Sequence, residues 1–586
     1  MIQERYKLWS EHSYFDLETR EELRALTDLL EIEDRFYMDL EFGTGGLRGI
    51  LAAGTNRMNI YVIRKATQGL ADTIREYGKV GMAKGVVIAY DSRRFSFRFA
   101  QEAALILAKN GIKVYLFDAL RPTPELSFAV RYLQAQAGIV ITASHNPKEY
   151  NGYKVYWEDG GQVPPAQADR ISEHISARES WVDLEPLLEE DARAQGLLIT
   201  VGEEIDQAYL SQVKDLSLYP ELAQEEGSTL KIVYSPLHGA GNVLVRRVLN
   251  ELGYTSVFVV PEQEKPDQNF STVPYPNPEI PSTFDLARHY GEQQQADLLL
   301  ATDPDSDRLG VVIRNQKGKY EQLTGNQIGV LLAYYLISQK KALGILSPKA
   351  TLIKTIASTD LADALALDLG VQVENVLTGF KFIAEKEKEL EEKGQGDFQF
   401  GFEESYGFLA GHFVRDKDGV IAAMLVAEAA LYYKQKEQFT LLQVLDKIYQ
   451  KYGYYHEAQT SITLKGKEGK AEMEQIMAGL RQSEIHSFAG IPLERIDDYE
   501  LRIGKRLSGD VPDKTYVLTL PQSKVLRYAF TGGGFVMVRP SGTEPKIKFY
   551  FSIRGTQPKT VEKTLVQVRE DLLAKVSQIL GKSLNH

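Results

Sequence analysis

A loop of alternating acidic residues carries the strongest chemical signal in the chain. Asp303, Asp305 and Asp307 come directly after the apolar run Asp297–Ala301, which is typical of a buried strand. Three carboxylates at this spacing repel one another unless a cation neutralises them, and oxygen ligands suit a hard divalent ion such as Mg²⁺. An EF-hand does not fit, because Arg308 stands where that loop needs Gly. The loop predicts a divalent-metal site, with a solvated acidic turn as the alternative.

A second polar loop, with the sequence T-A-S-H-N-P, follows the apolar strand predicted at Gly138–Thr142. Ser144 is a candidate nucleophile. Neighbouring side chains such as Ser144 and His145 are not expected to face each other, and no G-x-S-x-G motif occurs, so a serine hydrolase is disfavoured. An ordinary strand-to-helix turn is the alternative. Lys154, ten residues further on, could shuttle a proton or lie on the surface.

Two glycine-containing segments are suited to phosphate. Gly43–Gly49 offers unobstructed backbone amides and the guanidinium of Arg48, but it lacks the last glycine of a dinucleotide fingerprint. Arg539–Lys546 combines a guanidinium with two hydroxyls and a glycine after the strand predicted at Phe535–Val538, as a phosphate clamp does. A flexible glycine-rich turn is the alternative for the first segment, and a turn between strands bounded by Pro and Gly is the alternative for the second. No P-loop is present, which disfavours nucleotide hydrolysis.

Glu403, Glu404 and Ser405 follow a third strand, predicted at Phe398–Phe402. Carboxylates next to hydroxyls are typical acceptors for sugar hydroxyls, although this signal alone is weak. In three places an apolar strand is thus followed at once by a polar loop. Because ligands bind at the carboxyl ends of strands in open α/β sheets, we expect three domains to direct these loops at a common cleft.

The composition narrows the class of protein. A chain of 586 residues predicts about four domains, and its net charge of -12 argues against general binding to nucleic acid or to acidic membranes. The absence of cysteine excludes disulfides, thiol nucleophiles and cysteine-based zinc sites. No secretory signal is apparent in Met1–Asp16, and the longest near-apolar run, Ile328–Ile337, is too short to span a bilayer. A cytoplasmic enzyme for a small ligand is expected.

Strands alternate with longer helical patterns over most of the chain, which predicts an α/β fold. Three α/β domains are expected at 1–205, 206–323 and 324–455, and a C-terminal α+β domain at 456–586. The last element places Val561, Leu565, Val568 and Leu572 at helical spacing, with Gly581 as its stop. This helix is expected to serve packing.

Taken together and in order, the motifs TASHNP, DPDSDR, GFEES and RPSGTEP resemble those of the α-D-phosphohexomutase superfamily, in its long phosphoglucomutase-like branch of the phosphoglucomutase/phosphomannomutase group. The resemblance runs from Gly43 to Lys546. It implies three related α/β/α domains with mixed sheets and a C-terminal α+β domain around a central cleft. It also implies that Mg²⁺ is the cofactor and that glucose 1,6-bisphosphate acts as activator and intermediate.

The resemblance also implies roles for individual residues. Ser144 would carry the phosphoryl group, and Asp303, Asp305 and Asp307 would hold Mg²⁺ beside that phosphate. The other implied catalytic residues are Lys154 as general base, Arg308, Arg48 and His145, which would orient the loop or only pack beside it. The implied substrate-binding residues are Thr378, Gly379, Lys381, Glu403, Ser405, Lys417, Arg539, Ser541, Gly542 and Thr543.

The expected reaction is the interconversion of α-D-glucose 1-phosphate and glucose 6-phosphate. A phosphomannomutase or phosphopentomutase with the same mechanism is the nearest alternative, and a sugar phosphatase or a non-catalytic sugar-phosphate sensor represents other classes. Some relatives carry His where this chain has Phe380, so a histidine acid is not available there. The sequence makes no prediction of the oligomeric state.

Overall fold

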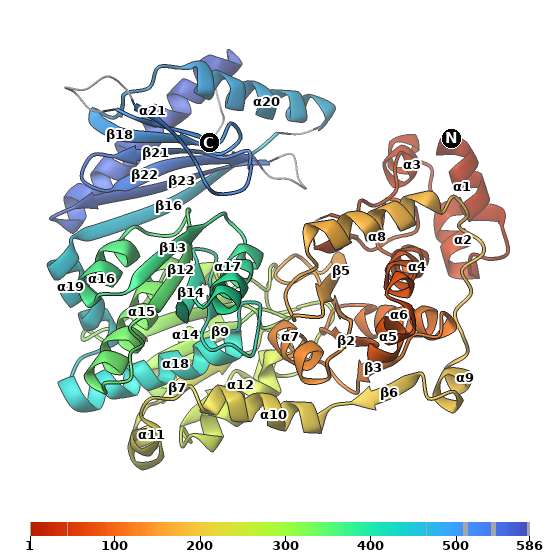
Figure 1. Cartoon of the computed structure of the whole chain (residues 1–586), viewed down its shortest axis with the longest axis horizontal. Helices are drawn as coiled ribbons and strands as arrows, with labels where there is room; N and C mark the ends of the chain where they lie inside the picture. Colours follow the sequence, from red (N-terminus) through yellow and green to blue (C-terminus); the bar gives the residue numbers. More distant parts are fainter. Residues whose placement is uncertain (1, 44, 465, 508–513, 541–545, 583–586) are drawn as a thin grey trace. The chain divides into compact units, whose positions relative to one another are not determined.

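The computed structural model describes residues 2–582 except 44, 465, 508–513 and 541–545 (Figure 1). These residues form two compact units. Unit 1 comprises Met1–Gly325 and Ser405–Gln438, and unit 2 comprises Asn326–Glu404 and Phe439–His586. Within the described residues, no helix combines the length and the apolar character needed to cross a membrane.

The first sheet of unit 1 has six strands in the order β1-β5-β4-β2-β3-β6. β4, β2, β3 and β6 are parallel, whereas β5 and β1 are antiparallel to their neighbours. The strands are β1 (Gly46–Ile50), β2 (Val86–Tyr90), β3 (Val114–Phe117), β4 (Ala137–Ile141), β5 (Tyr150–Trp157) and β6 (Leu198–Val201). Every residue of β2 and β4 is buried, which explains their uninterrupted apolar sequences.

Among the described residues, nine helices accompany this sheet in the sequence up to β6. They are α1 (Ile2–Glu11), α2 (Leu17–Arg24), α3 (Leu29–Phe36), α4 (Ile60–Glu76), α5 (Gly78–Lys84), α6 (Ser96–Lys109), α7 (Thr123–Tyr132), α8 (Pro165–Ala177) and α9 (Glu189–Ala194). One apolar core joins the N-terminal helices to the sheet, since Trp9, Phe15 and Phe36 belong to the same buried cluster as Val86 and Ile139.

The second sheet of unit 1 has the order β11-β10-β9-β7-β8. Its strands are β7 (Ile232–Ser235), β8 (Val257–Val259), β9 (Leu298–Thr302), β10 (Leu309–Arg314) and β11 (Tyr320–Gln322). The remaining elements of unit 1 are α10 (Glu203–Lys214), α11 (Pro220–Glu226), α12 (Gly241–Glu251), α13 (Pro261–Glu264), α14 (Asp285–Gln294), β15 (Gly407–Leu409), α18 (Gly419–Tyr432) and the short helices η1 (Gly227–Thr229), η2 (Pro281–Phe284) and η3 (Tyr433–Glu437). Here β9 is parallel to β7 and antiparallel to β10, so this sheet is mixed as well.

Unit 2 begins with parallel strands in the order β13-β12-β14. They are β12 (Ala350–Thr355), β13 (Gln372–Val376) and β14 (Asp397–Glu403), and their helices are α15 (Gly325–Ala342), α16 (Leu361–Leu369), α17 (Phe380–Lys393) and α19 (Leu441–Tyr452). β12 is buried at every position, as its apolar sequence predicts.

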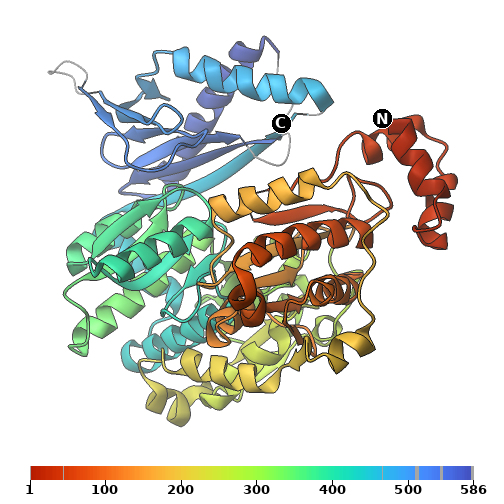
Figure 2. The same ribbon diagram turned by 45° about the vertical axis from the view of Figure 1, so that its right-hand side comes forward.

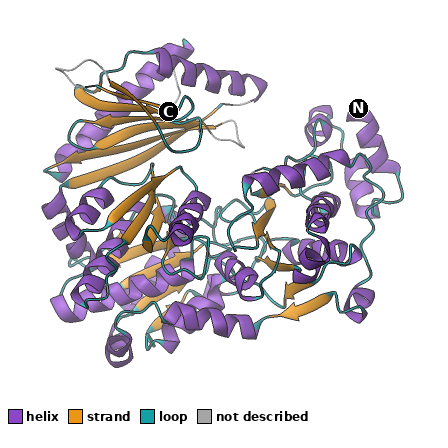
Figure 3. Ribbon diagram, in the orientation of Figure 1, coloured by secondary structure: helices purple, strands orange, loops and turns teal. Residues whose placement is uncertain are grey.

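The C-terminal part of unit 2 is an antiparallel sheet in the order β16-β23-β22-β21-β18-β19-β20. Its strands are drawn in orange in Figure 3. Its elements are β16 (Tyr454–Thr463), α20 (Gly466–Gln482), β17 (Ser487–Phe488), β18 (Ile491–Asp498), β19 (Ile503–Arg506), β20 (Lys514–Val517), β21 (Leu526–Phe530), β22 (Gly534–Pro540), β23 (Lys546–Gly555) and α21 (Pro558–Leu580). Figures 1 and 2 show α20 and α21 together on one face of this sheet, where α21 buries the four residues predicted for packing.

The predicted fold class is confirmed: the structure has mixed α/β sheets followed by a C-terminal α+β part. The interpretation of Gly43–Gly49 as a turn is wrong for its second half, because β1 starts at Gly46. A Cβ on Gly46 would lie 1.8 Å from the Tyr153 carbonyl oxygen, so glycine permits this close pairing with β5. The domain boundaries stay predictions, and those at 205 and 455 fall inside α10 and β16.

Helix α7 contains a carboxyl group that lies away from water. Glu125 is 0% exposed, and the nearest cation, Arg121, has its Nε 3.7 Å from Oε2. The same guanidinium donates two shorter bonds, of 2.7 and 3.0 Å, to Asp206. Burial, followed by the neighbouring carboxylate of Asp206, raises the pKa of Glu125 well above its usual range. The raised pKa favours the protonated form of Glu125 in the folded protein.

We predict that Glu125→Gln gains stability relative to the wild type as the pH rises. The raised pKa of Glu125 gives the folded wild type its full stability below the unfolded pKa of about 4.3, and this stability is lost as the pH rises toward the folded pKa. The glutamine variant has no such loss, so the difference in unfolding free energy grows by up to about 1.4 kcal/mol per pH unit. Denaturant unfolding at pH 5, 6, 7 and 8 measures it.

The matched control is Glu204→Gln, at an exposed position of α10. The difference in unfolding free energy between Glu204→Gln and the wild type is expected to change little with pH. An equally flat difference for Glu125→Gln would show that the buried carboxyl group is ionised in the folded protein.

Candidate active site

Ser144 lies in the loop that follows β4 and is 3% exposed. Its backbone has a φ of 51°, in the left-handed region, and its N–H donates to Thr142 Oγ1 at 2.8 Å. Its hydroxyl donates to Asp303 Oδ2 at 2.7 Å. The fold thus brings the candidate nucleophile into direct contact with the acidic loop, 159 residues later in the chain.

The three aspartates form a compact buried cluster between β9 and β10. One oxygen from each of Asp303, Asp305 and Asp307 lies within 4.8 Å of the others, and all three residues are at most 1% exposed. Asp305 Oδ1 and Asp307 Oδ1 have no hydrogen-bond partner among the described residues. Burial and the two neighbouring carboxylates raise the pKa of Asp303 well above its usual range. Oxygen ligands that repel one another and lack donors fit a divalent cation.

Two lysine ammonium groups neutralise part of this charge. Lys154 on β5 places Nζ 2.7 Å from Asp305 Oδ2 and 3.2 Å from Asp307 Oδ2. Lys417, just before α18, places Nζ 2.8 Å from Asp307 Oδ2. Burial opposes the charge of Lys154, but the two carboxylates outweigh it and raise its pKa. The alternative that Lys154 lies on the surface is wrong.

His145 lies closer to the serine than the sequence predicts. Its Nδ1 is 3.3 Å from Ser144 Oγ, so the expectation that these side chains do not face each other is wrong. The left-handed backbone at Ser144, which a sequence pattern does not reveal, changes the direction of the loop at this point. Burial, followed by the positive charges of Arg308 and Arg48, lowers the pKa of His145 well below its usual range. The lowered pKa favours the neutral imidazole, and the Ser144 hydroxyl donates to Asp303 Oδ2.

Each of the two predicted arginines contacts one of the loops of this centre. Arg48 on β1 donates to Asn146 Oδ1 at 3.3 Å, in the serine loop. Arg308 donates its backbone N–H to Asp303 Oδ1 at 3.1 Å, and its guanidinium pairs with Glu279. Both therefore supply positive charge within unit 1, next to the residues that would hold a phosphoryl group.

The sequence analysis missed several residues of this centre. Thr123, at the start of α7, donates to Asp305 Oδ2 at 2.8 Å. Asp91 and Arg93 follow β2 and bind the serine loop: Asp91 accepts a hydrogen bond from Thr142 Oγ1, and Arg93 donates to backbone carbonyls. A signal for Asp91 and Arg93 was present, because D-S-R-R comes directly after an apolar strand, as the recognised loops do.

Unit 2 gathers a second set of predicted residues. Glu404 follows β14 and accepts a hydrogen bond from Thr355 Oγ1 at 2.9 Å, and burial together with the charge of Glu403 raises its pKa. Arg539 at the end of β22 lies beside Tyr550 of β23. Burial and the charge of Glu404 raise the pKa of Tyr550, whereas Arg539 opposes this shift. Glu404 and Arg539 are therefore neighbours within unit 2.

The other predicted substrate-binding residues are placed as follows. Thr378 and Gly379 precede α17, with Gly379 at a φ of 122°, and Lys381 lies over the Phe382 ring at 4.9 Å. Ser405 lies two residues after Glu403, where the chain returns to unit 1. Ser541, Gly542 and Thr543 lie outside the described residues.

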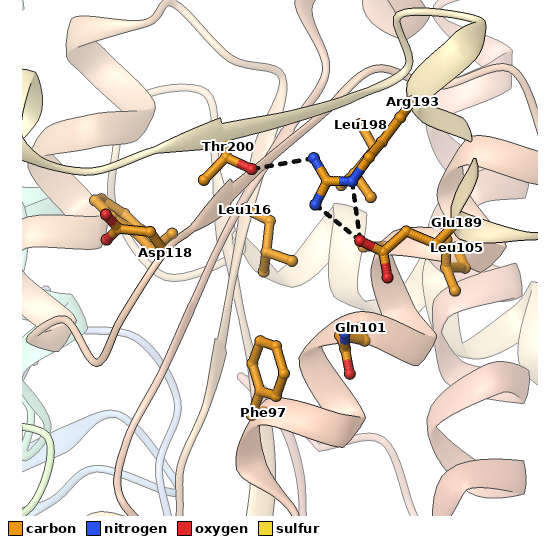
Figure 4. Close-up of a pocket in the computed structure, with 11 residues that line it drawn as sticks. Phe97, Gln101, Leu105, Leu116, Asp118, Glu189, Arg193, Leu198 and Thr200 are labelled. Carbon is orange, nitrogen blue, oxygen red and sulfur yellow. Dashed lines mark hydrogen bonds and ion pairs between the residues drawn. The ribbon is translucent and has the colours of Figure 1, made fainter. Parts of the chain in front are cut away.

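A separate pocket in unit 1 lies between α6, α9, β3 and β6 (Figure 4). Arg193 on its rim is paired with Glu189 at 2.8 Å and donates to Thr200 at 3.2 Å. Phe97, Leu116 and Leu198 are among the apolar residues that line it. None of the residues that line this pocket belongs to the motifs described above. The pocket is therefore not assigned to the chemistry predicted for Ser144.

Three family models match consecutive parts of the chain. They are those of phosphoglucomutase/phosphomannomutase α/β/α domain I at residues 39–181, domain II at 207–318 and domain III at 324–452. A phosphoglucomutase of Staphylococcus epidermidis is 40% identical over 518 residues, which are 88% of this chain and 90% of that protein. A phosphoglucomutase of Staphylococcus saprophyticus is 37% identical over 524 residues, with the same two shares.

Two solved structures share the fold. The phosphoglucomutase parafusin of Paramecium superposes with a TM-score of 0.68 at 18% identity, covering 93% of this chain and 96% of that one. A phosphoglucomutase/phosphomannomutase family protein of Burkholderia thailandensis gives a TM-score of 0.65 at 18% identity, covering 93% and 98%. At these identities the likeness shows the fold alone.

We predict that Asp305→Asn weakens the binding of Mg²⁺ by at least roughly tenfold, because an amide replaces one of three anionic ligands. Calorimetric titration of the purified protein with Mg²⁺ measures this without any substrate. The control is Asp285→Asn on α14, whose side chain is 72% exposed, and it is expected to bind like the wild type. Equal affinity of Asp305→Asn and the wild type would contradict a metal site at the triad.

Proposed function

Because the chain belongs to the phosphoglucomutase/phosphomannomutase family, we propose that it interconverts α-D-glucose 1-phosphate and glucose 6-phosphate through a phosphorylated Ser144. The observation that carries the proposal is the 2.7 Å contact between Ser144 Oγ and Asp303 Oδ2, inside a buried cluster of three aspartates and two lysines. The preference for glucose is supported by the two phosphoglucomutases that are 37% and 40% identical.

In the proposed reaction, phosphorylated Ser144 donates its phosphoryl group to the free hydroxyl of a hexose monophosphate. The bond between phosphorus and Ser144 Oγ breaks, a bond to the sugar oxygen forms, and the sugar's proton ends on Ser144 Oγ. The resulting hydroxyl makes the hydrogen bond to Asp303 that the structure contains. Glucose 1,6-bisphosphate is the intermediate, and it then presents its other phosphate to Ser144, so that the phosphoryl group returns and the isomer leaves.

The residues around Ser144 support this transfer. Mg²⁺ held by Asp303, Asp305 and Asp307 would supply Lewis-acid stabilisation of the phosphoryl group. Lys154 Nζ is proposed to carry the proton between the sugar hydroxyl and Ser144 Oγ, and its contacts with Asp305 and Asp307 keep the nitrogen at the centre. Arg308 and Arg48 add positive charge for the transferred group, and neutral His145 orients the serine loop.

Substrate recognition is proposed for the remaining residues of the family motifs. Glu403 and Ser405 would bind sugar hydroxyls, and Arg539 would bind the phosphate that does not react, together with Ser541, Gly542 and Thr543. Thr378, Gly379 and Lys381 would contact the sugar, and Lys417 a phosphate. Reorientation of the bisphosphate requires a clamp that accepts either end, which a guanidinium with neighbouring hydroxyls provides.

We predict that Ser144→Ala loses at least about a thousandfold in the rate of glucose 6-phosphate formation from glucose 1-phosphate, because the acceptor oxygen is removed. Initial rates are measured with Mg²⁺ and a trace of glucose 1,6-bisphosphate. Ser211→Ala, at an exposed position of α10, is the matched control.

An active Ser144→Ala would remove the serine from the mechanism. A wild type that turns over only mannose or pentose phosphates would identify a related mutase. Release of free phosphate in excess of isomer would indicate a phosphatase, and binding without any turnover would indicate a sensor.

We predict that Arg539→Ala raises KM for glucose 1-phosphate about 10- to 100-fold and changes kcat less, since a charge-assisted phosphate contact is worth roughly 1.5–3 kcal/mol. Full rate curves for the wild type, Arg539→Ala and the exposed control Arg506→Ala on β19 measure the two constants. A fall in kcat at unchanged KM would contradict the role of a substrate clamp.

A further inference from the structure

Arg93 is buried next to the loop that carries Ser144 and donates hydrogen bonds to the backbone of this loop. The residue is 3% exposed, and its two terminal nitrogens reach four carbonyl oxygens. Nη1 donates to Pro147 at 2.9 Å and to Tyr150 at 3.1 Å, and Nη2 donates to Ser144 and Asn146. One guanidinium thus connects carbonyls that are spread over the segment from 144 to 150.

The side chain of Arg93 is fully buried and faces the protein rather than solvent. A guanidinium has five N–H groups in a rigid fork, and four of them are used by the carbonyls. The fifth, on Nε, lies 3.2 Å from Asp91 Oδ2 in a buried ion pair and has no hydrogen-bond partner among the described residues. Phe270 lies over the guanidinium, with 4.9 Å between the ring centre and Cζ. Arg93 therefore acts on the loop rather than on a phosphate.

The partner of Arg93 holds the other side of Ser144. Asp91 accepts hydrogen bonds from the Arg93 backbone N–H at 2.9 Å and from Thr142 Oγ1 at 2.7 Å. Thr142 Oγ1 in turn accepts the N–H of Ser144 at 2.8 Å. The N–H of Ser144 is thus fixed through Thr142, and its carbonyl is fixed by Arg93. Both restraints originate from the same buried ion pair.

The backbone of Ser144 needs such restraints. Its φ of 51° is unfavourable for a residue with a Cβ, so the conformation persists only where surrounding contacts impose it. In the structure this conformation accompanies the 2.7 Å contact between Ser144 Oγ and Asp303 Oδ2. The charges of Arg93 and Asp91 compensate each other, so the pair adds little net charge beside the serine.

We propose that Arg93, paired with Asp91, is a positioning residue that holds the Ser144 peptide in its left-handed conformation and thereby aims Oγ at the acidic cluster. This inference rests on the proposed function of Ser144 as the phosphoryl acceptor. It assigns Arg93 no contact with substrate.

The first test is Arg93→Lys, which keeps the charge and replaces the fork by a single nitrogen. We expect kcat for glucose 1-phosphate to fall at least about 30-fold while KM changes less than about threefold, because alignment is lost and the phosphate contacts are kept. Arg94→Lys, the same change at the exposed neighbouring position, is expected to behave like the wild type. A variant with unchanged kcat, or one in which only KM rises, would overturn the proposal.

A second pair of variants tests the other restraint and leaves Arg93 in place. Thr142→Val removes the hydroxyl that links Asp91 to the N–H of Ser144, and Thr142→Ser retains it. We expect Thr142→Val to lower kcat and Thr142→Ser to restore it. Equal activity of the two variants would overturn the proposal, even if Arg93→Lys does not fold.

Hydrogen exchange gives a readout that does not depend on turnover. Amides of the 142–146 segment are expected to exchange at least about tenfold faster in Arg93→Lys and Thr142→Val than in the wild type and Arg94→Lys. Unchanged exchange would overturn the positioning role. A wild type without mutase activity but with these exchange differences would instead refute the proposed function and leave the inference standing.

Discussion

Three carboxylates within 4.8 Å of one another, removed from water, are the constraint on which the rest of this structure depends. Such a cluster is unfavourable unless cations surround it. The fold supplies Lys154 from β5 and Lys417 from the residue stretch before α18, and it still leaves two carboxylate oxygens without donors among the described residues. The remaining negative charge suits a divalent ion, and the hydroxyl of Ser144 points directly at the cluster. The same cluster of charges therefore requires compensating cations and positions the hydroxyl of Ser144.

The carboxyl ends of the strands position the residues of this cluster and of the serine loop. β2 leads to Asp91 and Arg93, β4 leads to Ser144, and β9 leads to the aspartates. Because the strands themselves are buried on both faces, their ends are rigid points from which short polar loops extend. Unit 2 repeats the principle with Glu403 at the end of β14 and Arg539 at the end of β22. In the proposed reaction, the first unit carries the transfer chemistry and most of the predicted recognition residues lie in the second.

The sequence predicted a large part of this arrangement because its signals are local. Continuous apolar runs such as Val86–Tyr90 must form buried strands, and polar residues directly after them must lie at one edge of the sheet. The features that were missed depend on long-range geometry. The 3.3 Å approach of His145 to Ser144 accompanies a positive φ that no residue type at this position predicts, and Glu279 reaches Arg308 from a loop without a motif. Arg93 differs from these residues, because its sequence pattern is that of the other loops but its side chain binds backbone carbonyls, and a residue pattern does not reveal such contacts.

The central claim is that Ser144 passes its phosphoryl group to a sugar and not to water. The most direct measurement is a rapid-quench experiment in which protein carrying a radiolabelled phosphate on Ser144 is mixed with unlabelled glucose 6-phosphate and Mg²⁺. The label is expected to leave the protein at least as fast as steady-state turnover and to appear first in the hexose bisphosphate. Label that stays on the protein during turnover, or that appears as inorganic phosphate, would contradict the central claim.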